Sequence, residues 1–308
     1  MRRTKGIFYA LVSSTTFGLI PLFSVPLMAE GLAAPTILFY RMGIAAAIMG
    51  LLVWVSGRRF RLARRDLPVL FLLGALYALT SLGLLCSYDF IPTGMATTIH
   101  FMYPLVVTGI MALFFKEKGS VWLLIAAVLS LLGVALLSWG DAAGGGNLQG
   151  IGLVLLTVLT YAVYIVCVNR SRVSQLDSLV LTFYVLTISA AIFLLFALAT
   201  SGVVLLHDRY AWGNALLLAV LPTVLSNLTL VLAVKRIGST MTSILGSMEP
   251  LTAVLVGVFH FGERFDLVGA VGLTLVVISV IVVILQGGNS GGGRCDATAP
   301  RLDGRSDH

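Results

Sequence analysis

Charged residues are scarce in this sequence. They make up 11% of the 308 residues, against about 25% in an ordinary soluble domain. Hydrophobic residues make up 58%, and the mean hydropathy is +1.03. So little polar surface excludes a soluble enzyme, a nucleic-acid-binding module and a disordered tail protein. The long apolar runs also exclude an outer-membrane barrel, because barrel strands alternate apolar and polar residues. The remaining class is an all-α polytopic membrane protein.

Cysteine and catalytic motifs are scarce as well. The three cysteines, Cys86, Cys167 and Cys295, match no metal-binding spacing, and we interpret them as free thiols. The sequence holds no P-loop, no His-Glu-x-x-His and no Gly-x-Ser-x-Gly motif. ATP-driven transport by this chain alone is therefore disfavoured, and we expect no cofactor, no metal and no nucleic-acid partner.

Ten apolar runs fill most of the chain. Each is near the roughly 20 residues that cross a bilayer core at about 1.5 Å per residue. The first is interpreted as a transmembrane helix and not as a signal peptide, because further runs follow it at once. The sequence thus predicts ten transmembrane helices, over residues 6–27, 34–56, 67–88, 93–115, 121–139, 148–169, 178–200, 211–233, 238–260 and 266–286.

The distribution of Lys and Arg predicts the orientation in the membrane. With a cytoplasmic N-terminus, 17 of the 20 basic residues fall in inside segments, and only Arg209 and Arg264 fall outside. The remaining one, Arg41, lies within a span. This positive-inside bias predicts that both termini are cytoplasmic. We expect a multi-pass protein of the inner cell membrane, as a monomer or a homodimer.

An internal repeat relates the two halves of the chain. Residues 91–138 align without a gap on residues 237–284, with 9 identities in 48 positions. Met-Tyr-Pro-Leu at 102–105 falls on Met-Glu-Pro-Leu at 248–251. Because five helices per half is an odd number, the second copy must be inverted in the membrane. Inverted repeats are typical of alternating-access secondary transporters.

The repeat predicts the domain organisation. Residues 1–140 and 148–286 form the two five-helix repeats, and the Gly-rich stretch 141–147 links them. The Gly-rich, polar residues 287–308 are expected to form a disordered cytoplasmic tail.

These motifs resemble the EamA-type transporters of the drug/metabolite transporter superfamily. The resemblance covers residues 6–286 and implies two inverted five-helix bundles around a central cavity, with transport of a small metabolite, often export. The residues that carry it are the two Pro-Leu motifs, the acidic residues Glu117 and Glu263 that follow them, Gly262-Glu263-Arg264-Phe265, which resembles the family's "GER" loop, and Phe39-Tyr40-Arg41, which resembles its aromatic-Arg signature. The first copy departs from the loop motif, with Lys116-Glu117-Lys118.

Glu249 is the leading candidate for a binding site. A charge at mid-bilayer costs at least about 2.5–3.5 kcal/mol, so such charges face a cavity or a partner. Glu249 lies 11 residues from either end of the run 238–260, and Pro250 removes a helical hydrogen bond beside it. It could bind a substrate or carry a coupling proton. The alternative is a structural acid that pairs with Arg41 or a hydroxyl.

Arg41 is the second charge within a span. It could bind a substrate carboxylate or pair with Glu249, so that the two would together hold a zwitterion such as an amino acid. Alternatively its side chain extends outward from a depth of roughly 9 Å. The neighbouring Tyr40 could supply an aromatic wall of the site.

Three further polar residues complete the candidate site. His100 lies one turn before Tyr103, which is the repeat counterpart of Glu249. The imidazole could relay protons or simply pack through hydrogen bonds. Asn227 could line the cavity or join helices.

The favoured function is therefore a secondary active exporter of a small metabolite, such as an amino acid or a related amphipathic compound, that works by alternating access around a midplane cavity. We expect this protein not to be an enzyme. The alternatives are an intramembrane enzyme, and a channel or scaffold without carrier activity.

Overall fold

The structure is a computed structural model that describes residues 2–60, 62–91, 93–116, 121–137, 147–200, 202–260 and 267–289. These residues form helices and contain no strand. Short 3₁₀ helices cover Arg64–Asp66 and Arg172–Gln175, and a π-helix, η4, covers Val220–Leu225. The α-helices are α1 (Arg2–Phe17), α2 (Ile20–Ala29), α3 (Ala34–Val55), α4 (Leu67–Ser87), α5 (Thr93–His100), α6 (Tyr103–Phe115), α7 (Val121–Leu137), α8 (Leu148–Arg170), α9 (Ser178–Ala199), α10 (Arg209–Ala219), α11 (Ser226–Ile237), α12 (Ser239–Leu245), α13 (Met248–His260) and α14 (Leu267–Asn289).

Several helical stretches are long and apolar enough to cross a membrane. In the described part of the chain there are 6 of them, and three shorter apolar helices lie in α6, α7 and α14. Two of the long stretches, Arg3–Ala29 and Arg209–Ile237, are interrupted rods built from α1 with α2 and from α10 with η4 and α11. The chain is therefore an all-helical multi-pass membrane protein, and the exact number of ten spans stays a prediction.

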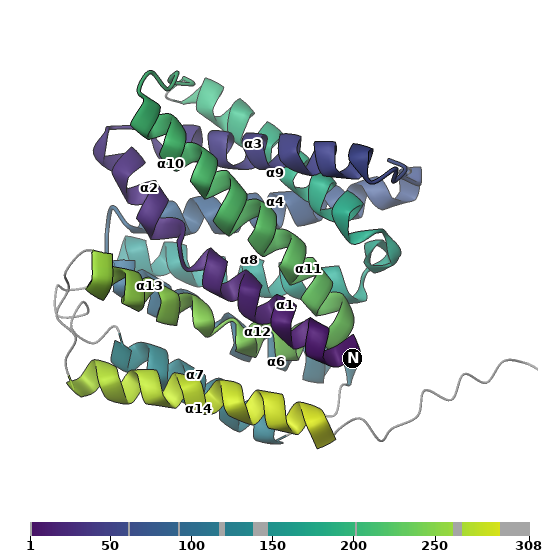
Figure 1. The fold of residues 1–308 in the computed structure, drawn as a ribbon, viewed down its shortest axis with the longest axis vertical. Helices are drawn as coiled ribbons and strands as arrows, with labels where there is room; N and C mark the ends of the chain where they lie inside the picture. The colour runs from purple at the N-terminus through teal and green to yellow at the C-terminus, as the bar shows by residue number, and fades with distance from the viewer. Residues whose placement is uncertain are drawn as a thin grey trace, which may run out of the picture.

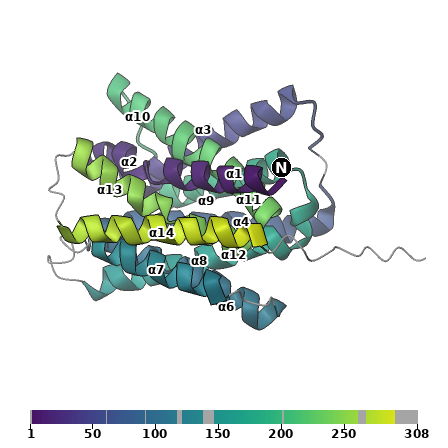
Figure 2. The same cartoon turned by 60° about the horizontal axis from the view of Figure 1, so that its bottom comes forward.

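The packing of the helices follows the two-fold pattern of an inverted repeat. Under the repeat, α3 corresponds to α9 and α7 to α14, and the members of each pair pack against each other. The pairing of α1 with α11 has its counterpart in the pairing of α8 with α4. Figures 1 and 2 both show α7 beside α14 along one edge of the bundle, away from α3 and α10. This arrangement fits the two-repeat fold that the sequence predicts.

Two helices break at corresponding places in the two halves. The first break separates α5 from α6 at residues 101–102, and the second separates α12 from α13 at residues 246–247. Pro104 and Pro250 lie in the first turn of the second segment in each case. A proline is tolerated there because the first N–H groups of a helix have no intrahelical partner. Paired interrupted helices are typical of transporter binding sites.

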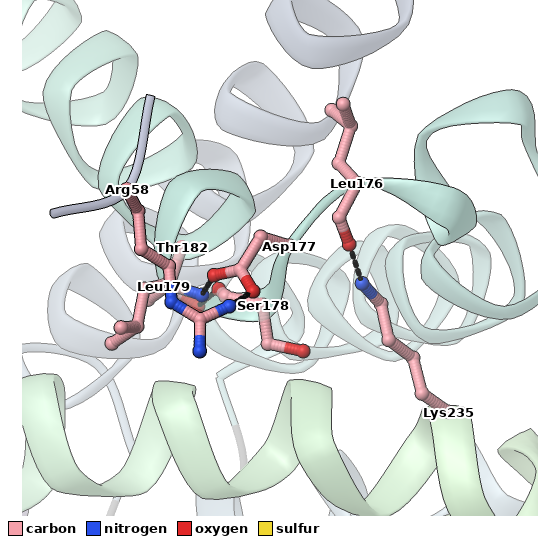
Figure 3. Close-up of polar contacts among 7 residues, drawn as sticks. All are labelled: Arg58, Leu176, Asp177, Ser178, Leu179, Thr182 and Lys235. Carbon is pink, nitrogen blue, oxygen red and sulfur yellow. Dashed lines mark hydrogen bonds and ion pairs between the residues drawn. The ribbon is translucent and has the colours of Figure 1, made fainter. Parts of the chain in front are cut away.

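Polar contacts tie the loop before α9 to its neighbours at one end of the bundle. Arg58 forms an ion pair with Asp177, and Asp177 also caps α9 by accepting a 2.9 Å hydrogen bond from the backbone N–H of Leu179. Lys235 on α11 donates to the carbonyl oxygen of Leu176 (Figure 3). These contacts lie on the side that the basic residues predict to be cytoplasmic.

Candidate substrate-binding site

Arg41 lies inside the bundle, and its side chain is 3% exposed. Its Nε donates a 2.8 Å hydrogen bond to Thr223 Oγ1, and Nη2 donates to the carbonyl oxygen of Pro222 at 3.4 Å. The guanidinium also stands over the ring of Phe17, at 5.6 Å from its centroid. The side chain therefore points inward and does not extend to the membrane surface.

The π-helix η4 explains how Thr223 reaches Arg41. Pro222 has no backbone N–H, so the carbonyl of Leu218 lacks its usual helical donor. The Thr223 hydroxyl donates to this carbonyl at 2.8 Å. Since its proton is used there, the same oxygen accepts the hydrogen bond from Arg41. The local proline defect thus creates the acceptor that positions the cation, in agreement with the frequent occurrence of π-bulges at functional sites.

A cavity opens beside the Arg41 side chain. It holds about 430 Å³ of space not filled by protein atoms, its mouth included, between α1, α2, α3, α4 and the end of α5. Most of its wall is apolar, with side chains such as Ile37, Leu85 and Leu218. Its polar lining consists of Ser24, Arg41, Thr80, Ser81, Tyr88 and His100.

Glu249 lines a second, adjoining cavity. This space of about 240 Å³ shares the walls of Phe17, Ile20, Leu84 and Tyr88 with the first cavity. Within the part of the chain that the structure describes, no ion pair joins Arg41 to Glu249. The two charges thus come close together, as the sequence predicts, but they face neighbouring cavities.

The backbone of Glu249 is held in place by two contacts. Its N–H donates to the carbonyl oxygen of Gly246 at 2.9 Å, which bridges the break between α12 and α13. Its own carbonyl packs against Gly18, where a Cβ atom would overlap it and would also come within 2.8 Å of Thr252 Cβ. A glycine at position 18 therefore lets α1 approach α13 closely. The side chain is buried, at 7% exposure.

His100 is held by one ring nitrogen and leaves the other without a partner. Its Nδ1 lies 2.8 Å from Thr157 Oγ1, and the Thr157 hydroxyl donates to the carbonyl of Val154 at 2.7 Å. The hydroxyl can therefore only accept from His100, so Nδ1 carries the proton and Nε2 is an acceptor. Nε2 is buried and makes no hydrogen bond.

Tyr103 stands at the crossing of the two broken helices. Its ring packs edge-on against Tyr161, with centroids 4.8 Å apart, and its hydroxyl lies against Gly246 at the other break. Tyr103 is not among the residues that line either cavity. Its position is thus between the repeats, behind the cavity walls.

Asn227 and Tyr40 also lie outside the two cavities. The Asn227 amide donates to the hydroxyl of Tyr77 at 2.7 Å and to the carbonyl of Thr223 at 2.9 Å, so it joins helices. The Tyr40 hydroxyl donates to the carbonyl of Val204 at 3.1 Å in the segment before α10. Neither side chain is placed by the structure where it would contact a ligand in these cavities.

Comparisons with known proteins place this fold in a family. A model of the EamA-like transporter family matches residues 4–139 and again residues 148–285. The chain belongs to the EamA-like transporter family.

Relatives of this EamA-like transporter occur in bacteria and archaea. It is 24% identical over 284 residues to the uncharacterized transporter YcbK of Bacillus subtilis, across 87% of this chain and 88% of that protein. It is 28% identical over 188 residues to an uncharacterized transporter of Archaeoglobus fulgidus, across 61% of this chain and 66% of that protein. A solved crystal structure with 16% identity shares the fold, with a TM-score of 0.79 over 94% of this chain and 99% of that chain.

Two cavity residues of this EamA-like transporter are not predicted by its sequence pattern. Ser24 lies in α2 between Pro21 and Pro26, and Tyr88 caps the end of α4. Tyr88 lines both cavities, although its place near a span end is typical of an interfacial aromatic. The available signal for Ser24 is a lone hydroxyl in an apolar segment with two prolines. In the described residues, no cluster of His, Cys, Asp and Glu side chains could hold a metal ion.

Proposed function

We propose that this EamA-like transporter is a secondary active carrier that exports a small amphipathic metabolite, such as an amino acid, across the inner cell membrane by alternating access. The observation that carries the proposal is the pair of adjoining cavities, one lined by Arg41 and the other by Glu249. They lie where α1 and α2 meet helices of both repeats, beside the broken helix α12–α13. A buried charge of each sign is costly unless it serves a ligand or an ion.

The position of the cavities supports a carrier that is closed on one side. Their walls include Ser24, Leu85 and Tyr88, near the ends of α2 and α4 that the charge distribution predicts to be outside. At the opposite end, the Arg58–Asp177 and Lys235–Leu176 contacts hold the loop before α9 against α3 and α11. A carrier that alternates between the two sides needs such a one-sided arrangement.

Glu249 is the residue we assign to proton coupling. Its carboxyl group is buried, and in the described residues no side chain donates a hydrogen bond to it. The charged side chain whose field acts on it is Arg41, and the titratable tyrosines within range are Tyr77, Tyr88, Tyr103 and Tyr161. A carboxyl group in such surroundings can gain and lose a proton with each transport cycle.

The test of this function is transport by the purified protein in liposomes. Labelled amino acids and related carboxylates are screened for uptake with and without a pH gradient, and for counterflow against unlabelled compound. We expect saturable counterflow and faster net transport with the gradient. Conductive flux that does not saturate would overturn the carrier in favour of a channel.

Glu249→Gln tests the coupling role. We expect normal insertion, loss of pH-driven net transport and retention of any pH-independent counterflow. Glu30→Gln is the matched control, because Glu30 is an exposed carboxylate at the end of α2 and should leave transport unchanged. Saturable, pH-dependent kinetics that are the same in Glu249→Gln as in the parent protein would reject the assignment.

A further inference from the structure

We propose that the cavity lined by Arg41 is by itself the substrate site, and that it binds a small carboxylic acid that carries an N–H or O–H donor and an apolar side chain. Arg41 binds the carboxylate, and His100 together with Ser24 binds the donor group. This inference rests on the proposed function and specifies its substrate class. Glu249, in the adjoining cavity, is then free for the coupling proton.

Two unpartnered polar atoms of the same cavity point to the ligand. His100 Nε2 and Ser24 Oγ are both buried and make no hydrogen bond in the structure. Their side chains are 2% and 1% exposed. A buried polar atom without a partner is costly and rare, and it calls for an explanation such as a ligand. Because both residues line the cavity that also holds Arg41, one small molecule can satisfy them together.

The chemistry of the three groups fixes what that molecule must offer. The guanidinium of Arg41 uses Nε and Nη2 for protein contacts, and Nη1 has no hydrogen-bond partner among the described residues. It can only donate, so it requires an anionic acceptor, and a planar carboxylate fits it best. His100 Nε2 can only accept, so it requires an N–H or O–H donor. The Ser24 hydroxyl can do either.

The rest of the wall determines the remainder of the ligand. Ile20, Ile37, Leu38 and Leu218 present hydrocarbon to the cavity and offer no further polar partner. A ligand side chain that fills this part must therefore be apolar. The site thus differs from a zwitterion site between Arg41 and Glu249, since the acceptor for the donor group is an imidazole and not a carboxylate.

A competition series on one carbon skeleton tests the ligand chemistry. Tritiated leucine is bound to the purified full-length protein in detergent and displaced by unlabelled leucine, 2-hydroxy-4-methylpentanoate, 4-methylpentanoate or leucinamide. We expect the 2-hydroxy acid to compete within about threefold of leucine. We expect 4-methylpentanoate, which lacks the donor, and leucinamide, which lacks the carboxylate, to be weaker by about tenfold or more.

The possible failures of this series are distinguishable. Equal competition by leucinamide would overturn the role of Arg41, and failure of the 2-hydroxy acid alone would favour a zwitterion site. If the liposome screen finds saturable transport of other compounds while none of these carboxylates binds, the substrate class is wrong and the carrier function stands. If no compound shows saturable transport, the proposed function itself fails.

Ser24→Ala separates ligand binding from structure. The change removes a hydroxyl that has no partner in the protein, so we expect an unchanged or raised unfolding temperature and affinity for leucine lower by about tenfold. Ser130→Ala is the matched control, because Ser130 Oγ is equally buried and unpartnered but lies on α7, away from the cavity. It should leave affinity unchanged. Equal affinities of the two variants would overturn the role of Ser24.

His100→Gln and His100→Asn separate the two ring nitrogens. A Gln side chain can place its carbonyl oxygen near the Nε2 position, whereas the shorter Asn can replace only the contact with Thr157. We expect His100→Gln to keep the preference for leucine over 4-methylpentanoate and His100→Asn to lose it. The same preference in both variants would overturn the assignment of Nε2 as the acceptor.

Discussion

Arg41 and Thr223 lie 182 positions apart in the chain and form a 2.8 Å hydrogen bond inside the bundle. The cation comes from the first repeat and its acceptor from the π-helix of the second. Any movement of one repeat against the other that separates α3 from η4 would break this bond. The charge that lines the cavity is therefore positioned by the opposite half of the molecule.

Thr223→Val should destabilise the protein. Valine has nearly the shape of threonine but leaves the Arg41 Nε–H and the Leu218 carbonyl without a partner, at a cost of about 1–3 kcal/mol. We expect a midpoint of thermal unfolding in detergent lower by several degrees, at about 2–4 °C per kcal/mol. Thr223→Ser keeps the hydroxyl and should unfold close to the parent protein. Equal midpoints for the valine and serine variants would contradict the prediction.

Arg41→Lys should abolish transport although the charge is kept. An ammonium group cannot reproduce the planar fork that reaches Thr223 and the Pro222 carbonyl while it also offers donors to the cavity. We expect normal insertion and a transport rate lower by at least about tenfold, since the carboxylate contact is a charge-assisted hydrogen bond. Arg59→Lys, at an exposed site, is the control. Full activity of Arg41→Lys would show that only the charge matters.

Much of the fold could be predicted from the sequence, because the membrane constrains it strongly. Apolar length and the scarcity of charge are sufficient for an all-helical membrane protein. The corresponding Pro104 and Pro250 predict paired breaks, and the structure has them a few residues earlier, at 101–102 and 246–247. Placing Arg41 and Glu249 among the candidates requires only the cost of charge in a bilayer.

The details of the site could not be predicted, because they depend on contacts between distant helices. The acceptor for Arg41 arises from a π-helix at Pro222, and no local pattern says which side chain will meet the exposed carbonyl. Ser24 gives no strong signal, since most serines in spans bond to their own helix. Tyr40, by contrast, follows a family-like motif but contacts the Val204 carbonyl outside the cavities. Sequence therefore predicts which charges are costly, and the structure is needed to divide them between two cavities.

Gly18→Ala should impair folding or transport. The added methyl group would overlap the backbone carbonyl of Glu249, which cannot yield as a flexible side chain can, so α1 and α13 must separate. We expect a lower unfolding temperature and a loss of Glu249-dependent coupling. Gly152→Ala is the matched control, because a Cβ at Gly152 on α8 meets nothing within 4 Å. If both variants behave like the parent protein, the close approach of α1 and α13 is not required.

The predicted orientation can be tested by cysteine labelling in intact cells. Arg59 and Arg209 are both exposed and lie at opposite ends of the bundle, so each is replaced by cysteine after Cys86, Cys167 and Cys295 have been changed to alanine. We expect a membrane-impermeant maleimide to label Arg209→Cys in whole cells and Arg59→Cys only after lysis. The reverse pattern would place both termini outside and would turn the cavities toward the cytoplasm.

Asp177 should contribute to stability mainly as a helix cap and only weakly as an ion-pair partner. Its Oδ1 accepts from the backbone N–H of Leu179, while the side chains of Arg58 and Asp177 are 49% and 32% exposed. Exposed ion pairs contribute about 0–1 kcal/mol, whereas loss of an N-cap costs about 0.5–2 kcal/mol. We therefore expect unfolding temperatures in the order Asp177→Ala below Asp177→Asn, with Arg58→Gln close to Asp177→Asn.

Salt separates the two contributions of Asp177. Because ions screen exposed pairs, about 1 M salt should remove the difference between the parent protein and Asp177→Asn but not the deficit of Asp177→Ala. If Arg58→Gln were as unstable as Asp177→Ala, the ion pair would be the stronger contact. It would then act as a lock on the cytoplasmic side, and its removal should speed transport under conditions where opening toward the cytoplasm limits the rate.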